Sequence, residues 1–145
     1  MNEIAEVIPT WKIKRVLRQM RGGSQAYLVE AENDRCYVCK FQGNPQGARS
    51  LINECIAHRL LRCLLVSTPN ICALELSEEL GQSGEIFFSV ASRRILPQGI
   101  LHFGSECPVH PKKKTIFDFL PARLLPSVVN LSDFVAAFTL DQWLH

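Results

Sequence analysis

The 145-residue sequence has no long apolar run and no leader-like N-terminus. Its apolar stretches are only a few residues long, whereas a helix that spans a bilayer needs about 20. The chain opens on "MNEIAEVIP", with acidic residues instead of a basic residue and an apolar block, so it does not read as a secretory signal. We therefore expect a cytoplasmic protein that does not contact a membrane.

Strong charge of either sign is also absent. The net charge is +2 and the isoelectric point is near 8.3, too mild to predict direct binding of nucleic acid. Hydrophobic residues make up 47% and charged residues 21% of the chain, as in ordinary globular domains. The length fits one domain over residues 1–145, with no internal repeat. The basic run at 112–114 fits a solvated turn.

The six cysteines do not form a pattern that is typical of zinc sites. Only Cys36 and Cys39 are spaced C-x-x-C, and no second pair follows at zinc-ribbon spacing. In an extended strand, residues three apart point to opposite faces. We expect reduced, packed cysteines and no metal site; a small redox or metal protein built on this pair is the alternative.

The hydrophobic pattern predicts an α+β fold. Short apolar runs indicate strands at 10–14, 26–32, 36–42, 71–77 and 86–92, which suggests an antiparallel sheet of about five strands. A long helix is expected over 48–66, with Ile52, Ile56, Leu60 and Cys63 recurring at helical spacing. We expect a loop over 78–85 and irregular chain over 95–121. Short helices would follow, the last one capped by Ser132 with Asp133 in its first turn.

The stretch "RGGSQ", Arg21 to Gln25, connects the first two predicted strands. Adjacent glycines allow positive φ and close approach of backbone to a ligand, and the N–H groups of such a turn can hold phosphate oxygens. Taken alone, these residues favour a simple hairpin turn, which adjacent glycines also form. The stretch is neither a Walker A motif nor a G-x-G-x-x-G motif.

Two charged residues stand in apolar surroundings. Lys40 lies on the third predicted strand, and Glu54 lies on the long helix, on nearly the same side as Leu51 and Leu61. A carboxylate that points toward a packed surface needs a cation, and a buried ammonium needs a partner. We therefore expect Lys40 to pair with Glu54; the alternative is an edge strand from which Lys40 extends into solvent. A strand-three lysine paired with a helix glutamate is the arrangement by which protein kinases hold ATP phosphates.

Several stretches closely resemble the HipA-like kinase family, bacterial proteins related to the HipA toxin kinases. The resemblance runs from about Trp11 to the last residue. Its most specific part is "YVCKFQGNPQGARSLINECIAHRLLRCLLVSTPN", supported by "GGSQAYLV", "HFGS", "DFLP" and the closing "FTLDQWL". The resemblance implies a kinase-like N-terminal lobe over about 11–94, followed by a linker and the start of a helical part over 95–145.

The resemblance also implies roles for individual residues. Gly22, Gly23, Ser24 and Gln25 would form the phosphate loop, and Lys40, held by Glu54, would contact the phosphates of ATP with Mg²⁺. Asp141 would be the acid of the family's D-x-W stretch. Backbone groups of "GILHFGSE" or "FDFLP" would contribute to adenine binding.

The chain departs from the family pattern in one respect. It reaches His145 before the Asn and catalytic Asp that follow the D-x-W stretch, and before the later metal-binding Asp. Without a base and a Mg²⁺ site, phosphoryl transfer lacks positioning and charge neutralisation. We expect the N-terminal nucleotide-binding portion of such a kinase, inactive alone, whose parent acts on a protein or other acceptor. The alternative is a non-catalytic protein that binds a complete kinase or an antitoxin-like partner, with self-association through the C-terminal helix.

Overall fold

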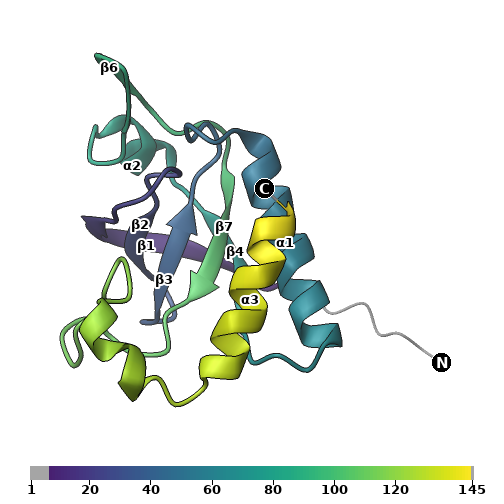
Figure 1. Cartoon of the computed structure of the whole chain (residues 1–145). Coiled ribbons are helices and arrows are strands. Elements are labelled where there is room, and N and C mark those ends of the chain that lie inside the picture. The colour runs from purple at the N-terminus through teal and green to yellow at the C-terminus, as the bar shows by residue number, and fades with distance from the viewer. Residues whose placement is uncertain (1–6, 145) are drawn as a thin grey trace.

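The computed structural model describes residues 7–144, the side chain of Leu144 excepted, and within them five strands close into a barrel (Figure 1). The barrel strands are β1 (Thr10–Gln19), β2 (Tyr27–Ala31), β3 (Cys36–Lys40), β4 (Ile71–Glu75) and β7 (Leu101–Glu106). The helix α1 (Ala48–Cys63) and the last helix α3 (Leu131–Leu144) lie side by side against one flank of the barrel, next to β7.

The sheet closes because β1 is shared between two neighbours. Around the barrel the order is β1-β2-β3-β7-β4. Residues 10–12 of β1 pair in parallel with β4, and residues 13–19 pair antiparallel with β2. Two irregularities in the β1–β2 register, after Ile13 and after Val16, let this ten-residue strand bend between its partners. The α+β class and the five-stranded sheet are confirmed, whereas the expected antiparallel sheet is instead a barrel closed by one parallel pair.

Alternating side chains fill the barrel interior. Along β3, Tyr37 and Cys39 point inward, and Phe41 continues the same face just beyond the strand. Gly104 of β7 makes room for this packing, because a Cβ there would lie 2.7 Å from Leu74 Cδ1 and 2.8 Å from Cys72 Sγ. The outward face of β3, which carries Lys40, is left for α1.

The fifth barrel strand is not the one that the sequence predicted. The run at 86–92 contributes β5 (Phe88–Val90), which pairs with β6 (Arg93–Ile95) in a separate two-stranded sheet. Its apolar residues Ile86 and Phe88 are fully buried in the core cluster without joining the barrel ladder. The strand β7 comes instead from 95–121, expected to be irregular, so the barrel continues past residue 94.

Two smaller expectations about helix positions are wrong. The segment 78–85, expected to be a loop, contains the short helix α2 (Glu78–Gln82), whose first turn is capped by Ser77 Oγ accepting from Leu80 N at 3.2 Å. The helix α3 begins at Leu131, so Ser132 lies inside its first turn and is not the cap. Asp133 is in the first turn of α3, as expected. A short 3-10 helix, η1 (Ala122–Ser127), precedes α3.

The inner face of α1 also differs from the expected one. Its buried residues are Ser50, His58 and Leu61, while Ile52, Ile56, Leu60 and Cys63 are exposed. The face turned to the barrel is therefore mostly polar. The helix packs next to β7, and its residue Glu54 reaches Lys40 at the end of β3.

The expected packing of the cysteines is confirmed only in part, because Cys36, Cys39 and Cys72 are buried but Cys63 is exposed. All six cysteines are free thiols, and Cys39 belongs to the interior cluster whereas Cys36 does not. No helix within residues 7–144 is both long and apolar enough to cross a membrane.

Two buried titratable side chains are held in one charge state. Glu30 of β2 accepts hydrogen bonds from Arg15 Nε at 3.0 Å and Nη2 at 2.5 Å, and Lys14 and His110 lie within 3.5 Å. These bonds, that of Arg15 first, lower the pKa of Glu30 to about 2. His102 of β7 is 3% exposed; its Nδ1 accepts from Gln42 N at 3.1 Å, and its Nε2 has no hydrogen-bond partner among the described residues. Burial lowers the pKa of His102 to about 4.

His102 predicts a loss of stability in mild acid. In the unfolded chain its pKa returns toward 6.5, so between pH 6.5 and 4 the unfolded state binds more protons than the folded state. The contribution of neutral His102 to the free energy of unfolding is fully present above pH 6.5. It is lost as the pH falls through the pKa of His102 in the folded state, by about 3 kcal/mol in all. We expect denaturant unfolding of the wild type to show this slope and His102→Gln to flatten it. An unchanged slope in the variant would contradict the assignment; the loss due to Glu30 comes only below its ordinary pKa of 4.5.

Candidate functional site

The turn at 42–47 fixes where α1 begins relative to the end of β3. The buried Asn44 donates from Nδ2 to Phe41 O at 2.7 Å and accepts from Gln46 N at 2.9 Å. Gly47 has φ +77, a conformation that costs little only for glycine, and Ser50 Oγ donates to its carbonyl at 2.8 Å. The stretch "GNPQG" is thus a rigid connection that sets the first turns of α1 above β3.

Lys40 and Glu54 meet across this connection. Lys40 ends β3 on the outward face, and Glu54 lies on the inner side of α1. Lys40 Nζ donates a hydrogen bond to Glu54 Oε1 and forms an ion pair with it. The pairing that the sequence predicted is present, and the solvent-facing alternative for Lys40 is not what the fold adopts.

The pair is less buried than the sequence suggested. The side chain of Lys40 is 21% exposed and that of Glu54 is 31% exposed. Water therefore screens part of their attraction and also lowers the cost of separating them. The pair lies between an exposed ion pair, worth up to about 1 kcal/mol, and a fully buried one, whose disruption costs about 3–5 kcal/mol. An ammonium in this position is oriented but still reachable.

The loop at 22–25 is a tight hairpin turn between β1 and β2. Gln25 N donates to Gly22 O at 3.1 Å, and Met20 N donates to Ala26 O at 2.7 Å. Gly22 has φ +139, which only glycine adopts readily, and a Cβ there would meet no atom within 4 Å. The backbone at Gly22 thus faces open space, as close approach of a ligand would require.

The other residues of the loop are engaged in contacts within the protein. The amide of Gln25 makes two hydrogen bonds with the backbone of Ser89, each 2.8 Å long, so its side chain ties the loop to β5. Ser24 is buried. A Cβ on Gly23 would lie 2.9 Å from Gln46 Nε2, which places the loop against the turn that follows Lys40. The glycine turn and the turn at 42–47 are therefore neighbours.

The remaining predicted residues lie elsewhere. Asp141 is exposed on α3 and already has an interaction partner. The backbone of β7 pairs with β3 on one side and β4 on the other, so "GILHFGSE" has little left to offer an adenine ring. In "FDFLP", Asp118 is held by Arg18 at 2.6 Å and accepts from Arg21 N at 3.2 Å.

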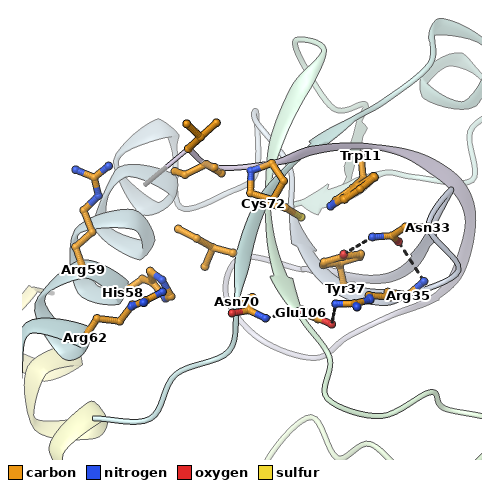
Figure 2. Close-up of a pocket in the computed structure, with 14 residues that line it drawn as sticks. Trp11, Asn33, Arg35, Tyr37, His58, Arg59, Arg62, Asn70, Cys72 and Glu106 are labelled. Carbon is orange, nitrogen blue, oxygen red and sulfur yellow. Dashed lines mark hydrogen bonds and ion pairs between the residues drawn. The ribbon is translucent and has the colours of Figure 1, made fainter. Parts of the chain in front are cut away.

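None of the three cavities described within residues 7–144 is lined by Lys40, Glu54 or the loop at 22–25. One of these cavities lies between α1 and the barrel (Figure 2), and its lining residues, such as Trp11 and Glu106, come from segments that are far apart in the sequence. No sequence motif marked these residues, because they come from separate segments that only the barrel brings together.

Comparison with protein-family models, with curated proteins and with solved structures finds no match to this chain.

The partial burial of the Lys40–Glu54 pair predicts an intermediate coupling energy. We expect a double-mutant cycle with Lys40→Met and Glu54→Gln, measured by denaturant unfolding, to give about 1–2 kcal/mol. The matched control is Lys14–Asp34, whose nitrogen and oxygen are 2.6 Å apart and whose side chains are 51% and 75% exposed. The control cycle should give at most about 0.5 kcal/mol. Equal coupling in both cycles would show that Glu54 does not hold Lys40 in solution.

Proposed function

We propose that this chain is the N-terminal nucleotide-binding portion of a HipA-like kinase, with Lys40 as the group that contacts nucleotide phosphates. The observation that carries the proposal is the ion pair between Lys40 at the end of β3 and Glu54 on the helix that follows. Protein kinases use a lysine on the third strand and a glutamate on the next helix in this way. A five-stranded sheet with a helix on one flank is compatible with that arrangement.

In this proposal each element has a physical task. Glu54 holds the Lys40 ammonium in one orientation, which reduces the side-chain entropy lost when a phosphate binds. The open backbone at Gly22 offers N–H donors from the neighbouring turn. Gln25 acts indirectly, because its bonds to Ser89 keep the turn in place.

The part of the chain that the structure describes offers no cluster of ligands for the Mg²⁺ that accompanies ATP in kinases. Among residues 7–144, no group of three or more His, Cys, Asp or Glu side chains is placed to hold a metal ion. The proposed role is therefore binding of nucleotide phosphates, and phosphoryl transfer by the chain alone is not part of it.

Nucleotide binding tests the proposal directly. With one lysine and one turn as contacts, we expect a Kd for ATP near or above about 1 mM, because few interactions offset the entropy of association. Lys40→Met should abolish the binding seen by titration calorimetry or NMR, and Lys14→Met, an exposed lysine in a different ion pair, should not. No γ-phosphate should be transferred. Robust autophosphorylation, or ATP binding unchanged by Lys40→Met, would refute the proposal.

A second function is favoured by the apolar surface of the two flanking helices. On α1, Ile52, Ile56 and Leu60 follow one another at every fourth residue and are 42–58% exposed. On α3, Phe138 is 58% and Trp143 is 85% exposed. An apolar surface of this kind marks interaction sites, so the alternative is a non-catalytic protein that associates with itself, a complete kinase or an antitoxin-like partner.

The alternative predicts association through these helices. In sedimentation over a concentration series, the wild type should form dimers or larger species, and Ile56→Glu or Phe138→Ser should shift the distribution toward monomer. Val90→Ser is the matched control, since Val90 is an exposed apolar residue on the separate β5–β6 sheet. A wild type that stays monomeric at high concentration would argue against self-association. The side chain of Leu144, on the same helix, lies outside the described residues.

A further inference from the structure

Two cysteines that lie far apart in the sequence face each other at the end of the β3–β7 pairing. Tyr37 of β3 is opposite Glu106 of β7 in the antiparallel register. The next step of this register places Cys36 opposite Cys107, and Cys107 N donates a hydrogen bond to Cys36 O at 2.8 Å. Because the side chains of directly opposed residues lie on the same face of an antiparallel pair, the two thiols are neighbours.

The spacing of such a pair fits a disulfide. Directly opposed, hydrogen-bonded residues have Cα atoms about 5.5 Å apart, within the range of about 4.4–6.8 Å that a disulfide spans. Their Cβ atoms are about 4.5–5.5 Å apart, so a bridge requires an approach of about 1 Å. Cys107 follows the last residue of β7, so its backbone can make this shift while the pairing of β7 with β3 stays intact.

The other pairings of cysteines on the barrel do not fit a disulfide. Cys36 and Cys39 lie on opposite faces of β3, since Cys39 belongs to the interior cluster and Cys36 does not. Cys39 and Cys72 are both opposite Gly104, so β7 lies between them and their Cα atoms are roughly 10 Å apart, beyond the limit of about 7 Å for a bridge. Cys107 is therefore the partner that the fold gives to Cys36.

The surroundings of the pair keep both thiols protonated at neutral pH. Burial, the charge of Glu30 and the nearness of Cys107, in that order, raise the pKa of the Cys36 thiol. Burial also raises the pKa of the Cys107 thiol. The guanidinium groups of Arg15, beside Cys36, and Arg18, beside Cys107, act in the opposite direction but do not outweigh it. Exchange at this pair is therefore slow at neutral pH, because the thiolate is the reacting form.

The two thiols differ in their access to solvent. Cys36 is 2% exposed, whereas Cys107 is partly exposed. A small molecule in solution reaches Cys107 first, and the neighbouring Cys36 then reacts with Cys107. This order is the one that a two-step exchange requires, with one accessible and one resolving thiol.

We propose that Cys36 and Cys107 form a reversible disulfide by exchange with a small-molecule disulfide. The Cys107 thiolate attacks one sulfur of the small disulfide, forms a mixed disulfide and releases the other half as a thiolate. The Cys36 thiolate then attacks the Cys107 sulfur and displaces the second half. The protons lost by the two cysteines are taken up by the two released thiolates. Two protein thiols are thus oxidised while the small disulfide is reduced to two thiols.

Oxidised glutathione is the probe for this exchange. The whole chain is used in a Cys63→Ser background, because Cys63 is an exposed thiol on α1 that can link two molecules. The folded chain is incubated with the probe at mildly alkaline pH, free thiols are then blocked and counted by mass spectrometry, and peptide mapping locates the link. We expect the loss of two thiols, with the peptide that contains Cys107 joined to the peptide that begins at Cys36. Dithiothreitol should restore both thiols.

Single variants separate the roles of the cysteines. Cys36→Ala should stop at the mixed disulfide of Cys107 with glutathione, and Cys107→Ala should form no bridge. Cys39→Ala is the matched control, since Cys39 lies in the same peptide as Cys36, and it should form the bridge as the parent does. Lys40→Met should also form it, so the result is independent of the nucleotide proposal. Unfolding curves establish that each variant is folded.

A comparison of folded and unfolded chain tests whether the fold brings the thiols together. In urea the register is lost, so the ratio of bridged to reduced protein at a fixed glutathione ratio should fall about tenfold or more. The proposal is overturned by any of three results. These are no link between Cys36 and Cys107 at excess oxidised glutathione, a link from Cys36 to Cys39 in its place, or a bridge that forms as readily in urea as in the folded chain.

Discussion

The parallel pairing of β1 with β4 is the constraint on which the rest of this structure depends. It closes the sheet, so the inward faces of five strands pack against one another and need no helix to cover them. The helix α1 is then free to present a polar inner face, with Ser50, Glu54 and His58, to the outside of the barrel. The same pairing places Trp11 of β1 opposite Leu74 of β4, and Trp11 and Cys72 both line the cavity.

The helix α1 contributes different side chains near its start and further along. Near its start, α1 is fixed by the bonds of Asn44 and Ser50, and it supplies one carboxylate to hold one ammonium. Further along, it supplies Arg59 and Arg62 to the lining of the cavity beside the barrel.

The outer face of α1 and the exposed side of α3 carry large apolar side chains that are exposed to water. Within the described residues, apolar side chains such as Ile52 and Trp143 remain in water although the core is well filled. Covering this apolar area with another surface would be favourable, because it removes the area from water. This area is also the reason that periodicity misjudged α1: the regular apolar stripe is real, but it faces away from the barrel.

The sequence by itself determined the local features. The apolar run at 36–42 predicted β3, and the need of Lys40 for a counter-charge predicted its pairing with Glu54. Tertiary structure alone decided the closure of the barrel, the place of β7 and the cavity. These depend on pairings between distant segments, such as Thr10 with Ala73 and Lys40 with Phe103, which neither periodicity nor spacing encodes. The run at 86–92 shows the physical reason: burying Ile86 and Phe88 satisfies their hydrophobicity whether or not they join the ladder, so a strand-like pattern does not fix which strand completes the sheet.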